Sequence, residues 1–245
     1  MLEITGARVH YTNMGYSPSA SVFKPGRLLL IFCVILGPSL RTEAMDGAAI
    51  IGQMEGAYAK VDDYQARVEV KTFESNGSVK VERFLYTFKK PRSIRLDMET
   101  PHPGMVLIFP DEKGKVYVRF GGKFPLPALH LSLSSRLLRV SSGQRLDQTD
   151  LGQLIANIAH SLTDQEQGPV SIIEEGQGLF IRVLAADHFR PHITTLYEFK
   201  IDEALWLPVA IEESTPAGSP ERSVVFKGLR INTGITRAFF HAARG

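Results

Sequence analysis

Apolar residues recur at two different spacings along this chain, and the spacing distinguishes expected helices from expected strands. Between Met45 and Val61 they recur every three or four residues, which predicts an amphipathic helix with Asp46 as its N-cap. A second stripe begins after Thr149-Asp150 and predicts another helix with one apolar face. The stripe consists of Leu151, Leu154, Ile155, Ile158, Ala159 and Leu162.

Elsewhere apolar and polar residues alternate, or short apolar runs stand between turn residues, as is typical of antiparallel strands. The expected strands cover 64–70, 79–88, 94–98, 105–109, 116–120, 170–173, 179–185, 193–202, 206–213 and 223–232. Asn76-Gly77 predicts a tight hairpin after the first strand. The apolar face of the second strand changes parity near Glu82-Arg83, which predicts a β-bulge there.

These elements predict a single α+β domain over residues 45–245. About ten antiparallel strands exceed what a flat sheet sustains, so we expect a strongly curved, unclosed half-barrel with the helices covering its concave face. The hollow between helices and sheet is either packed solid or left open for an elongated apolar ligand. Residues 121–133, rich in Gly, Pro and Leu, are interpreted as an apolar loop.

Residues 1–44 are interpreted as an export signal rather than as part of the domain. Lys24 and Arg27 precede the apolar run Leu28–Leu36, Gly37-Pro38 ends the run, and small residues lead to Ala44. The run is short for a membrane span, although an uncleaved anchor is the alternative. The segment before the signal shows no pattern, so we expect translation to begin later, at Met14 or near Val22.

Charge and cysteine content narrow the function classes. The whole chain has 28 basic and 26 acidic residues; residues 45–245 have 24 of each and form a neutral domain with no electrostatic case for nucleic acid. The single cysteine, Cys33, lies in the signal. The exported domain therefore lacks disulfides, thiolate nucleophiles and cysteine-ligated metals.

The arrangement of several segments resembles the LolA/LolB-like superfamily of periplasmic lipoprotein-binding proteins. The segments are the first helix, Val61–Tyr64, the Asn76-Gly77 hairpin, Phe88–Arg95, the strand opening near Met105, Tyr197–Asp202, Leu207-Pro208, and Phe226 to Phe239. The resemblance covers nearly all of residues 46–240 through loose motifs. It implies an unclosed barrel whose helices cover a hydrophobic cavity for acyl chains.

Under that resemblance, we expect the ligand-binding wall to come from strand and helix residues with apolar side chains. The expected wall is Val68, Phe84, Tyr86, Phe88, Ile94, Leu96, Leu154, Ile158 and Phe199. Leu154→Arg or Phe88→Asp is then expected to abolish fatty-acid binding. Lys90 and Arg92 are the expected residues for a lid or a head group. Carrier members have an arginine before the proline that opens the third strand, where it is taken to hold the lid closed by hydrogen bonds to helix carbonyls, and an aromatic residue a few positions later. This chain has Lys90 and Leu96 at these positions, and lysine lacks the planar five-donor group of arginine, so the specific carrier mechanism is not implied for this chain.

The basic cluster of Lys89, Lys90, Arg92 and Arg95 is interpreted as the charged outer face of a strand. The more specific alternative is a binding site for an anionic lipid head group or a membrane surface. His188 and His192 have a metal-ligand spacing, but Pro191 lies between them, so we expect a solvated loop.

The carboxylate pairs Glu174-Glu175 and Glu212-Glu213 are interpreted as solvated strand ends. No nucleophile, base and orienting group can be assigned together, so we expect no catalytic residues, no metal and no cofactor.

The sequence thus predicts a non-enzymatic periplasmic protein that shields the acyl chain of a lipoprotein or other lipid. It is expected to act as a monomeric carrier or chaperone, with transient contact to a membrane or membrane protein and no contact with nucleic acid. The alternative is a sensor of the same fold that does not transport lipid and instead regulates a partner protein.

Overall fold

A computed structural model describes residues 46–241 except 123–125, 139–143, 164–169 and 176–177. The expected export signal lies outside the described residues. The helices are α1 (Gly47–Ala59) and α2 (Leu151–Thr163), with 3₁₀ turns η1 (Arg136–Leu138), η2 (Leu146–Gln148) and η4 (Arg237–Phe240). The strands are β1 (Asp63–Phe73), β2 (Val79–Lys89), β3 (Ser93–Thr100), β4 (Val106–Phe109), β5 (Val116–Arg119), β6 (Leu129–Leu131), β7 (Ser171–Glu175), β8 (Gly178–Ala186), β9 (Thr194–Asp202), β10 (Leu207–Ser214) and β11 (Pro220–Ile231).

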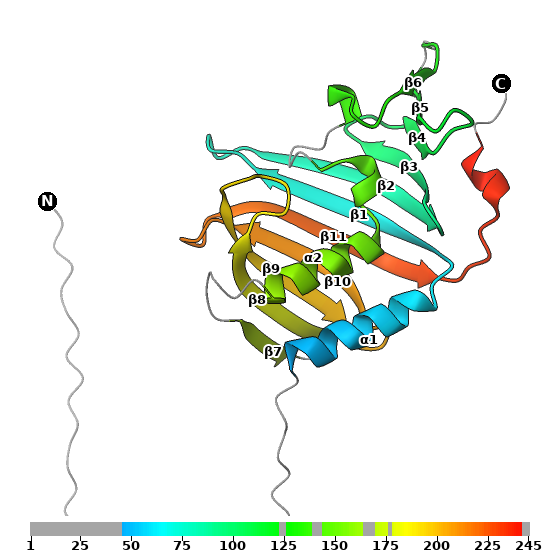
Figure 1. The fold of residues 1–245 in the computed structure, drawn as a ribbon. Coiled ribbons are helices and arrows are strands. Elements are labelled where there is room, and N and C mark those ends of the chain that lie inside the picture. Colours follow the sequence, from blue (N-terminus) through cyan, green and yellow to red (C-terminus); the bar gives the residue numbers. More distant parts are fainter. Residues whose placement is uncertain (1–45, 123–125, 139–143, 164–169, 176–177, 242–245) are drawn as a thin grey trace, which may run out of the picture. The chain divides into compact units, whose positions relative to one another are not determined.

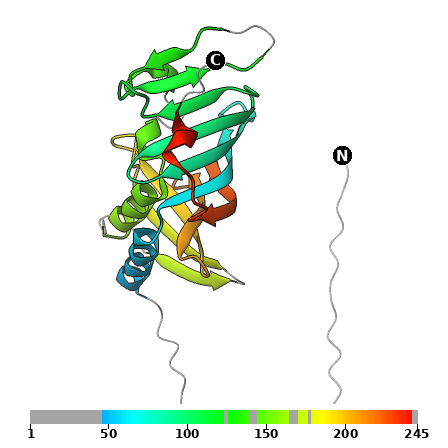
Figure 2. The ribbon, with the colours of Figure 1, turned by 90° about the vertical axis from the view of Figure 1, so that its right-hand side faces the viewer.

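All eleven strands form one antiparallel sheet in the order β6-β5-β4-β3-β2-β1-β11-β10-β9-β8-β7. Each strand pairs with its chain neighbour, except that β1 pairs with β11 in the middle of the sheet. The two outermost strands, β6 and β7, do not pair with each other, so the sheet is not closed. Figure 1 shows the sheet curving around α1 and α2, and Figure 2 shows both helices on the same side of it. The expected α+β half-barrel is confirmed.

The main core lies between the helices and the concave face. Strand alternation turns every second side chain of β1, β8 and β9 toward the helices, and most of these positions are apolar and almost fully buried, with Thr195 as a buried polar exception. The apolar stripe of α2 packs against them through Leu151, Leu154, Ile155 and Ile158. Burial of this apolar surface is the main stabilising contribution to the fold.

Most local predictions agree with the structure. Both helices form where their stripes predict them, and Asp46 caps α1 by accepting a hydrogen bond from the Ala48 amide at 3.4 Å. Gly77 adopts a φ of 81° in the β1–β2 hairpin, a conformation that glycine tolerates without strain.

Two sequence interpretations need correction. Residues 121–133 are not entirely loop, because Leu129–Leu131 pair with β5 and form β6, a strand beyond the ten that the sequence predicts. The bulge expected in β2 is displaced: the β1–β2 register runs without interruption, whereas the β2–β3 register shifts between Arg83 and Phe84, opposite Thr100 and Met98. The extra residue, Glu99, therefore belongs to β3.

The chain leaves β11 and ends the described part on the outer face of the sheet. Phe240 of η4 packs there with Val106 and Ile108 of β4. Within the described ranges, no helix is long and apolar enough to cross a membrane.

Candidate functional site: a hollow with two cavities

The N-terminus of α2 is fixed over the hollow by polar contacts. Asp150 accepts hydrogen bonds from the amides of Gly152 and Gln153 at 2.8 and 3.2 Å, as an N-cap does. The Tyr58 hydroxyl of α1 donates to the same carboxylate at 3.0 Å, and the Leu151 amide donates to the Tyr64 hydroxyl at 3.0 Å. Both α1 and β1 thus position the start of α2.

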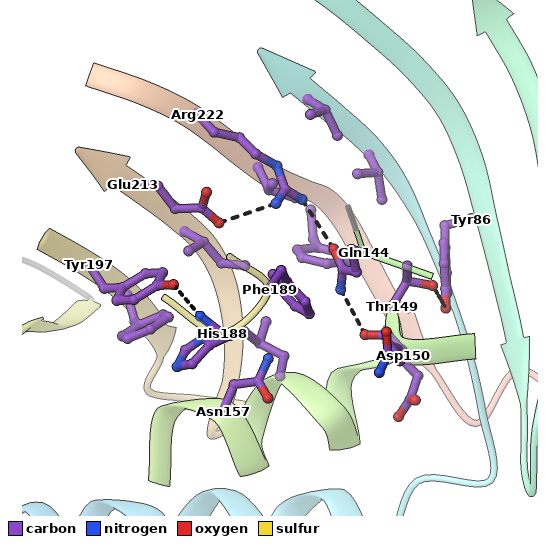
Figure 3. A pocket seen from close by; sticks show the side chains of 18 of the residues that line it. Tyr86, Gln144, Thr149, Asp150, Asn157, His188, Phe189, Tyr197, Glu213 and Arg222 are labelled. Carbon is purple, nitrogen blue, oxygen red and sulfur yellow. Dashed lines mark hydrogen bonds and ion pairs between the residues drawn. The ribbon is translucent and has the colours of Figure 1, made fainter. Parts of the chain in front are cut away.

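Directly beneath α2 lies the first cavity, which we call the narrow cavity (Figure 3). Its volume is about 80 Å³, and it opens to the outside. Its walls come from β1, β2, β9, β10, β11, α2, the residues that precede α2 and the loop between β8 and β9. They comprise Val68, Val70, Phe84, Tyr86, Gln144, Gln148, Thr149, Asp150, Leu154, Asn157, His188, Phe189, Tyr197, Phe199, Ile211, Glu213, Arg222, Val224 and Phe226.

The second cavity lies over β2 to β6 and has η1 and η2 among its walls; we call it the wide cavity. Its volume is about 360 Å³, and most of its lining is apolar. The lining comprises Glu82, Phe84, Tyr86, Leu96, Met98, His102, Met105, Leu107, Val118, Phe120, Leu129, Leu131, Leu137, Leu138, Leu146 and Thr149. Phe84, Tyr86 and Thr149 line both cavities and form the wall that separates them, with the Tyr86 and Thr149 hydroxyls hydrogen-bonded to each other at 3.1 Å.

Six of the nine expected wall residues line these cavities. Val68, Leu154 and Phe199 line the narrow cavity, Leu96 lines the wide cavity, and Phe84 and Tyr86 line both. The alternation of β1, β2, β3 and β9 turns the five strand residues to the concave face, and Leu154 belongs to the apolar stripe of α2 that faces it. Their role in ligand binding remains a prediction.

The other three expected wall residues line neither cavity. Phe88, Ile94 and Ile158 are 1%, 1% and 0% exposed and belong to the core. Phe88 stacks on Tyr64 with ring centroids 5.0 Å apart, beneath the start of α2. A charge at Phe88 would therefore destabilise the fold itself, and Phe88→Asp cannot test the cavity.

Lys90 joins the start of the third strand to the end of α1. Its ammonium donates hydrogen bonds to the carbonyls of Tyr58 and Ala59 at 2.8 and 3.2 Å, and it lies 4.5 Å from the centre of the Tyr58 ring. A cation at a helix C-terminus satisfies terminal carbonyls and favours the helix dipole. Lysine therefore makes the contact to helix carbonyls that the resemblance assigns to arginine.

Arg92 contacts the 3₁₀ turn η2 rather than α1. It pairs with Asp147 of η2 at 3.0 Å, and Arg145 pairs with the same carboxylate at 2.8 Å. In the rest of the basic cluster, Arg95 pairs with Asp97 and Lys89 lies 3.6 Å from buried Asp63. Lys89, Lys90 and Arg92 thus join strands to neighbouring segments, whereas the carboxylate partner of Arg95 lies in its own strand and its link to another segment is a hydrogen bond to the Phe239 carbonyl at 3.0 Å.

His188 contradicts the interpretation of its segment as a solvated loop. Its ring stacks on Tyr197 with centroids 4.6 Å apart, and its Nε2 lies 2.8 Å from the Ser161 hydroxyl of α2. Burial lowers the pKa of His188 to about 4. His192 is exposed, as expected. No group of three metal-ligating side chains occurs among the described residues.

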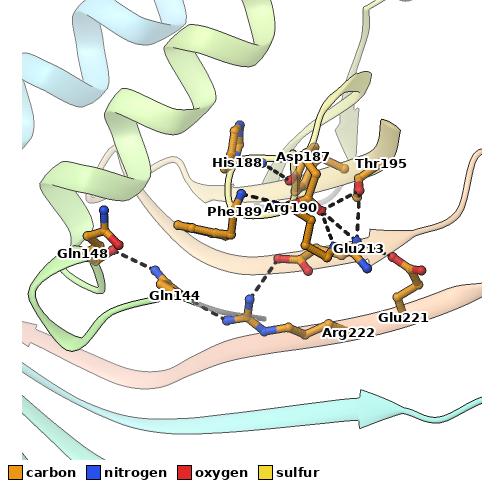
Figure 4. A network of polar contacts seen from close by, with 11 residues as sticks. Gln144, Gln148, Asp187, His188, Phe189, Arg190, Thr195, Glu213, Glu221 and Arg222 are labelled. Atoms are coloured by element: carbon orange, nitrogen blue, oxygen red, sulfur yellow. Dashed lines mark hydrogen bonds and ion pairs between the residues drawn. The ribbon is translucent and has the colours of Figure 1, made fainter. Parts of the chain in front are cut away.

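Glu213 also contradicts the interpretation as a solvated strand end. It is 7% exposed and lies 3.2 Å from Arg222, which is 8% exposed. Desolvation raises the pKa of Glu213 above its ordinary value, although the nearby guanidinium opposes this effect. Figure 4 shows this pair beside a second network, in which Arg190 pairs with Asp187 and Glu221.

Sequence reasoning missed the polar lining of the narrow cavity. Gln144 and Arg222 meet across 78 positions of sequence, and no local spacing relates them. A partial signal existed for Arg222, because it shares a strand parity with the apolar residues Val224 and Phe226. A charge at such a position is expected to face the core side of the sheet.

Neither protein-family models nor curated proteins gave a match to this chain. Several solved structures are similar. The MucA/MucB complex of Pseudomonas aeruginosa has 13% identity and a TM-score of 0.45, covering 80% of this chain and 61% of the other. A LolA superfamily protein from Nitrosomonas europaea has 12% identity and a TM-score of 0.36, covering 80% and 98%. Lipoprotein LppX of Mycobacterium tuberculosis has 11% identity and a TM-score of 0.40, covering 78% and 97%.

The superfamily that the sequence resembles is thus represented among the similar structures. The chain spans about 60% of the length of the MucB chains. The functional argument below is based on the residues of this chain.

Proposed function

We propose that this protein is a periplasmic, non-enzymatic binding protein that shields an acyl chain of a lipid or lipoprotein in its concave hollow. The observation that carries the proposal is the wide cavity. This cavity has a volume of about 360 Å³, a mostly apolar lining and an opening to the outside. Pockets of ~300–1,000 Å³ with apolar walls and a few polar groups are typical of small-ligand sites.

The driving force would be removal of hydrocarbon from water. Each buried methylene contributes ~0.8 kcal/mol, so a partly enclosed chain gives useful and reversible affinity. Reversibility suits a carrier or chaperone, which must release its lipid. Periplasmic location is supported by the export signal that the sequence predicts at Lys24–Ala44.

The direct test is native mass spectrometry of protein purified without detergent from its own periplasm, followed by titration with acyl ligands. Leu96→Trp fills the wide cavity from β3 and is expected to weaken acyl binding about tenfold or more, as the loss of two buried methylenes would. Leu85→Trp is the matched control: strand alternation turns Leu85 of β2 away from the hollow, so binding should remain within about twofold.

A folded protein that carries no lipid and binds no acyl ligand would contradict the proposal. Binding without transfer of lipid between vesicles, together with retention of one specific protein, would favour the alternative role as a sensor.

A further inference from the structure

One arginine in the narrow cavity lacks a complete set of partners. The Arg222 side chain is 10% exposed and comes from β11. Its Nη1 lies 3.2 Å from Glu213 Oε1, and its Nη2 lies 3.3 Å from Gln144 Oε1 (Figures 3 and 4). Its Nε is the single buried side-chain nitrogen or oxygen without a hydrogen-bond partner in the described part of the chain.

The two existing contacts of Arg222 are long for a guanidinium. Charge-assisted hydrogen bonds usually measure ~2.7–2.9 Å, whereas these measure 3.2 and 3.3 Å. A buried donor without a partner is unfavourable unless a ligand or water satisfies it. Arg222 is therefore held in place by two long contacts and has one buried donor, Nε–H, without a partner.

The shape of the guanidinium indicates what would complete it. The Nε–H and the adjacent Nη2–H point from the same edge, and this edge matches the two oxygens of a carboxylate. The Nε position is unpartnered, and the contact of Nη2 with the neutral Gln144 amide is weaker than a contact with an anion. A carboxylate could occupy the edge while Glu213 keeps its contact with Nη1.

The size of the two cavities indicates what is attached to that carboxylate. The narrow cavity of about 80 Å³ admits a small head group and excludes a large one. The wide cavity lies on the other side of the wall formed by Phe84, Tyr86 and Thr149 and has the volume and apolar lining for a hydrocarbon tail, which would reach it by parting the Tyr86–Thr149 hydrogen bond. A molecule that fits both spaces has a small anionic head and one long apolar chain.

We propose that Arg222 is the head-group site for a free fatty acid, whose carboxylate binds the Nε and Nη2 edge while its tail lies in the wide cavity. This assignment rests on the proposed function and specifies its ligand class. Glu213 is the nearest competing anion. Burial raises its pKa, so Glu213 accepts a proton more readily than an ordinary glutamate when a second carboxylate arrives.

The test compares palmitate, methyl palmitate and hexadecyl phosphate by isothermal titration calorimetry against the purified full chain. The wild-type protein should bind palmitate about tenfold or more tighter than the methyl ester, which lacks the charge. Arg222→Gln should reduce this preference to within about twofold. Arg182→Gln, which removes an exposed arginine from the β8–β9 pairing, should retain the preference.

Arg222→Gln leaves Glu213 buried without its cation and is at risk of misfolding, so Glu213→Gln/Arg222→Gln is the second variant. In that neutral pair the preference for palmitate should also disappear. Equal binding of acid and ester by the wild type, or a preference that survives in the double variant, would overturn the assignment. Binding of hexadecyl phosphate at least as tight as palmitate would overturn the carboxylate as the head group. Absence of binding of all three ligands would instead overturn the proposed function.

Discussion

The two halves of the concave hollow differ in what fills them. Under α2 the protein fills almost all of the space itself, because α2 brings a full apolar stripe and β9 brings the stacked rings of Tyr197 and Phe199. Over β2 to β6 the covering elements among the described residues are the short turns η1 and η2, and a cavity more than four times as large lies between them and the sheet. Leu137 of η1 is even 78% exposed.

This difference shows where stability and binding reside in one sheet. A helix with a regular stripe fills the curvature that a twisted sheet creates, and the packed half stabilises the molecule. A 3₁₀ turn presents few side chains and leaves the curvature vacant. Truncations of apolar side chains in the filled half should therefore affect mainly stability, and truncations of apolar side chains in the vacant half mainly binding.

The largest expected effect comes from the same truncation in each half. Leu154→Ala removes a packed side chain beneath α2 and should lower the free energy of unfolding by about 3 kcal/mol. Leu96→Ala borders space that is already vacant and should lower it by about 1 kcal/mol. Urea unfolding followed by circular dichroism measures both values, and equal losses would show that the two halves are packed alike.

The second-largest effect on stability is expected from acidification, which acts through His188 in the filled half. The pKa of His188 falls from 6.5 to about 4 on burial, so the unfolded chain binds more protons between these values and stability decreases as the pH falls through them. After allowance for partial exposure we expect a loss of about 2 kcal/mol.

The measurement for this effect is urea unfolding at several pH values. His188→Gln removes the titrating ring, so its stability should vary less over this range. His192→Gln changes an exposed histidine of the same loop and should retain the wild-type dependence. The idea fails if the wild type and His188→Gln lose stability equally.

The sequence predicted the filled half better than the vacant half, for a physical reason. The stripe from Leu151 to Leu162 and the Asn76-Gly77 turn are local signals, and both elements form where expected. The short strand at Leu129–Leu131 lies in a segment rich in proline and glycine and has too few residues to show alternation.

The site was predictable only in part, because its apolar and polar residues follow different rules. The alternation of side chains along a strand predicts which face of the sheet apolar wall residues such as Val68 and Tyr86 occupy. Glu213 and His188 have polar neighbours in the sequence, so no local pattern indicates that they are buried. Their burial depends on contacts with segments elsewhere in the chain. The contact between Arg222 and Gln144 has the same origin.

A smaller effect is expected where α1 is joined to the sheet. Lys90→Met keeps the aliphatic stem but removes two hydrogen bonds to the carbonyls of Tyr58 and Ala59, which should cost about 1 kcal/mol. Lys90→Arg keeps the charge and donors and should remain within about 0.3 kcal/mol of the wild type. Thermal unfolding measures the stability, and hydrogen exchange should increase in the last turn of α1 of Lys90→Met alone; unchanged exchange would show that the lysine does not hold the helix.

The smallest effect on stability is expected at Arg92, beside the vacant half. Its side chain is 63% exposed, and Arg145 remains on Asp147 when Arg92 is replaced, so Arg92→Gln should cost no more than about 0.5 kcal/mol. Arg92→Gln/Arg145→Gln leaves the buried Asp147 carboxylate without a cation and should cost more than the two single losses together. Because η2 lines the wide cavity, the double variant should also exchange a bound acyl ligand faster in stopped-flow displacement, while Arg182→Gln should not. Additive losses with an unchanged exchange rate would mean that the Asp147 contacts do not control access to the cavity.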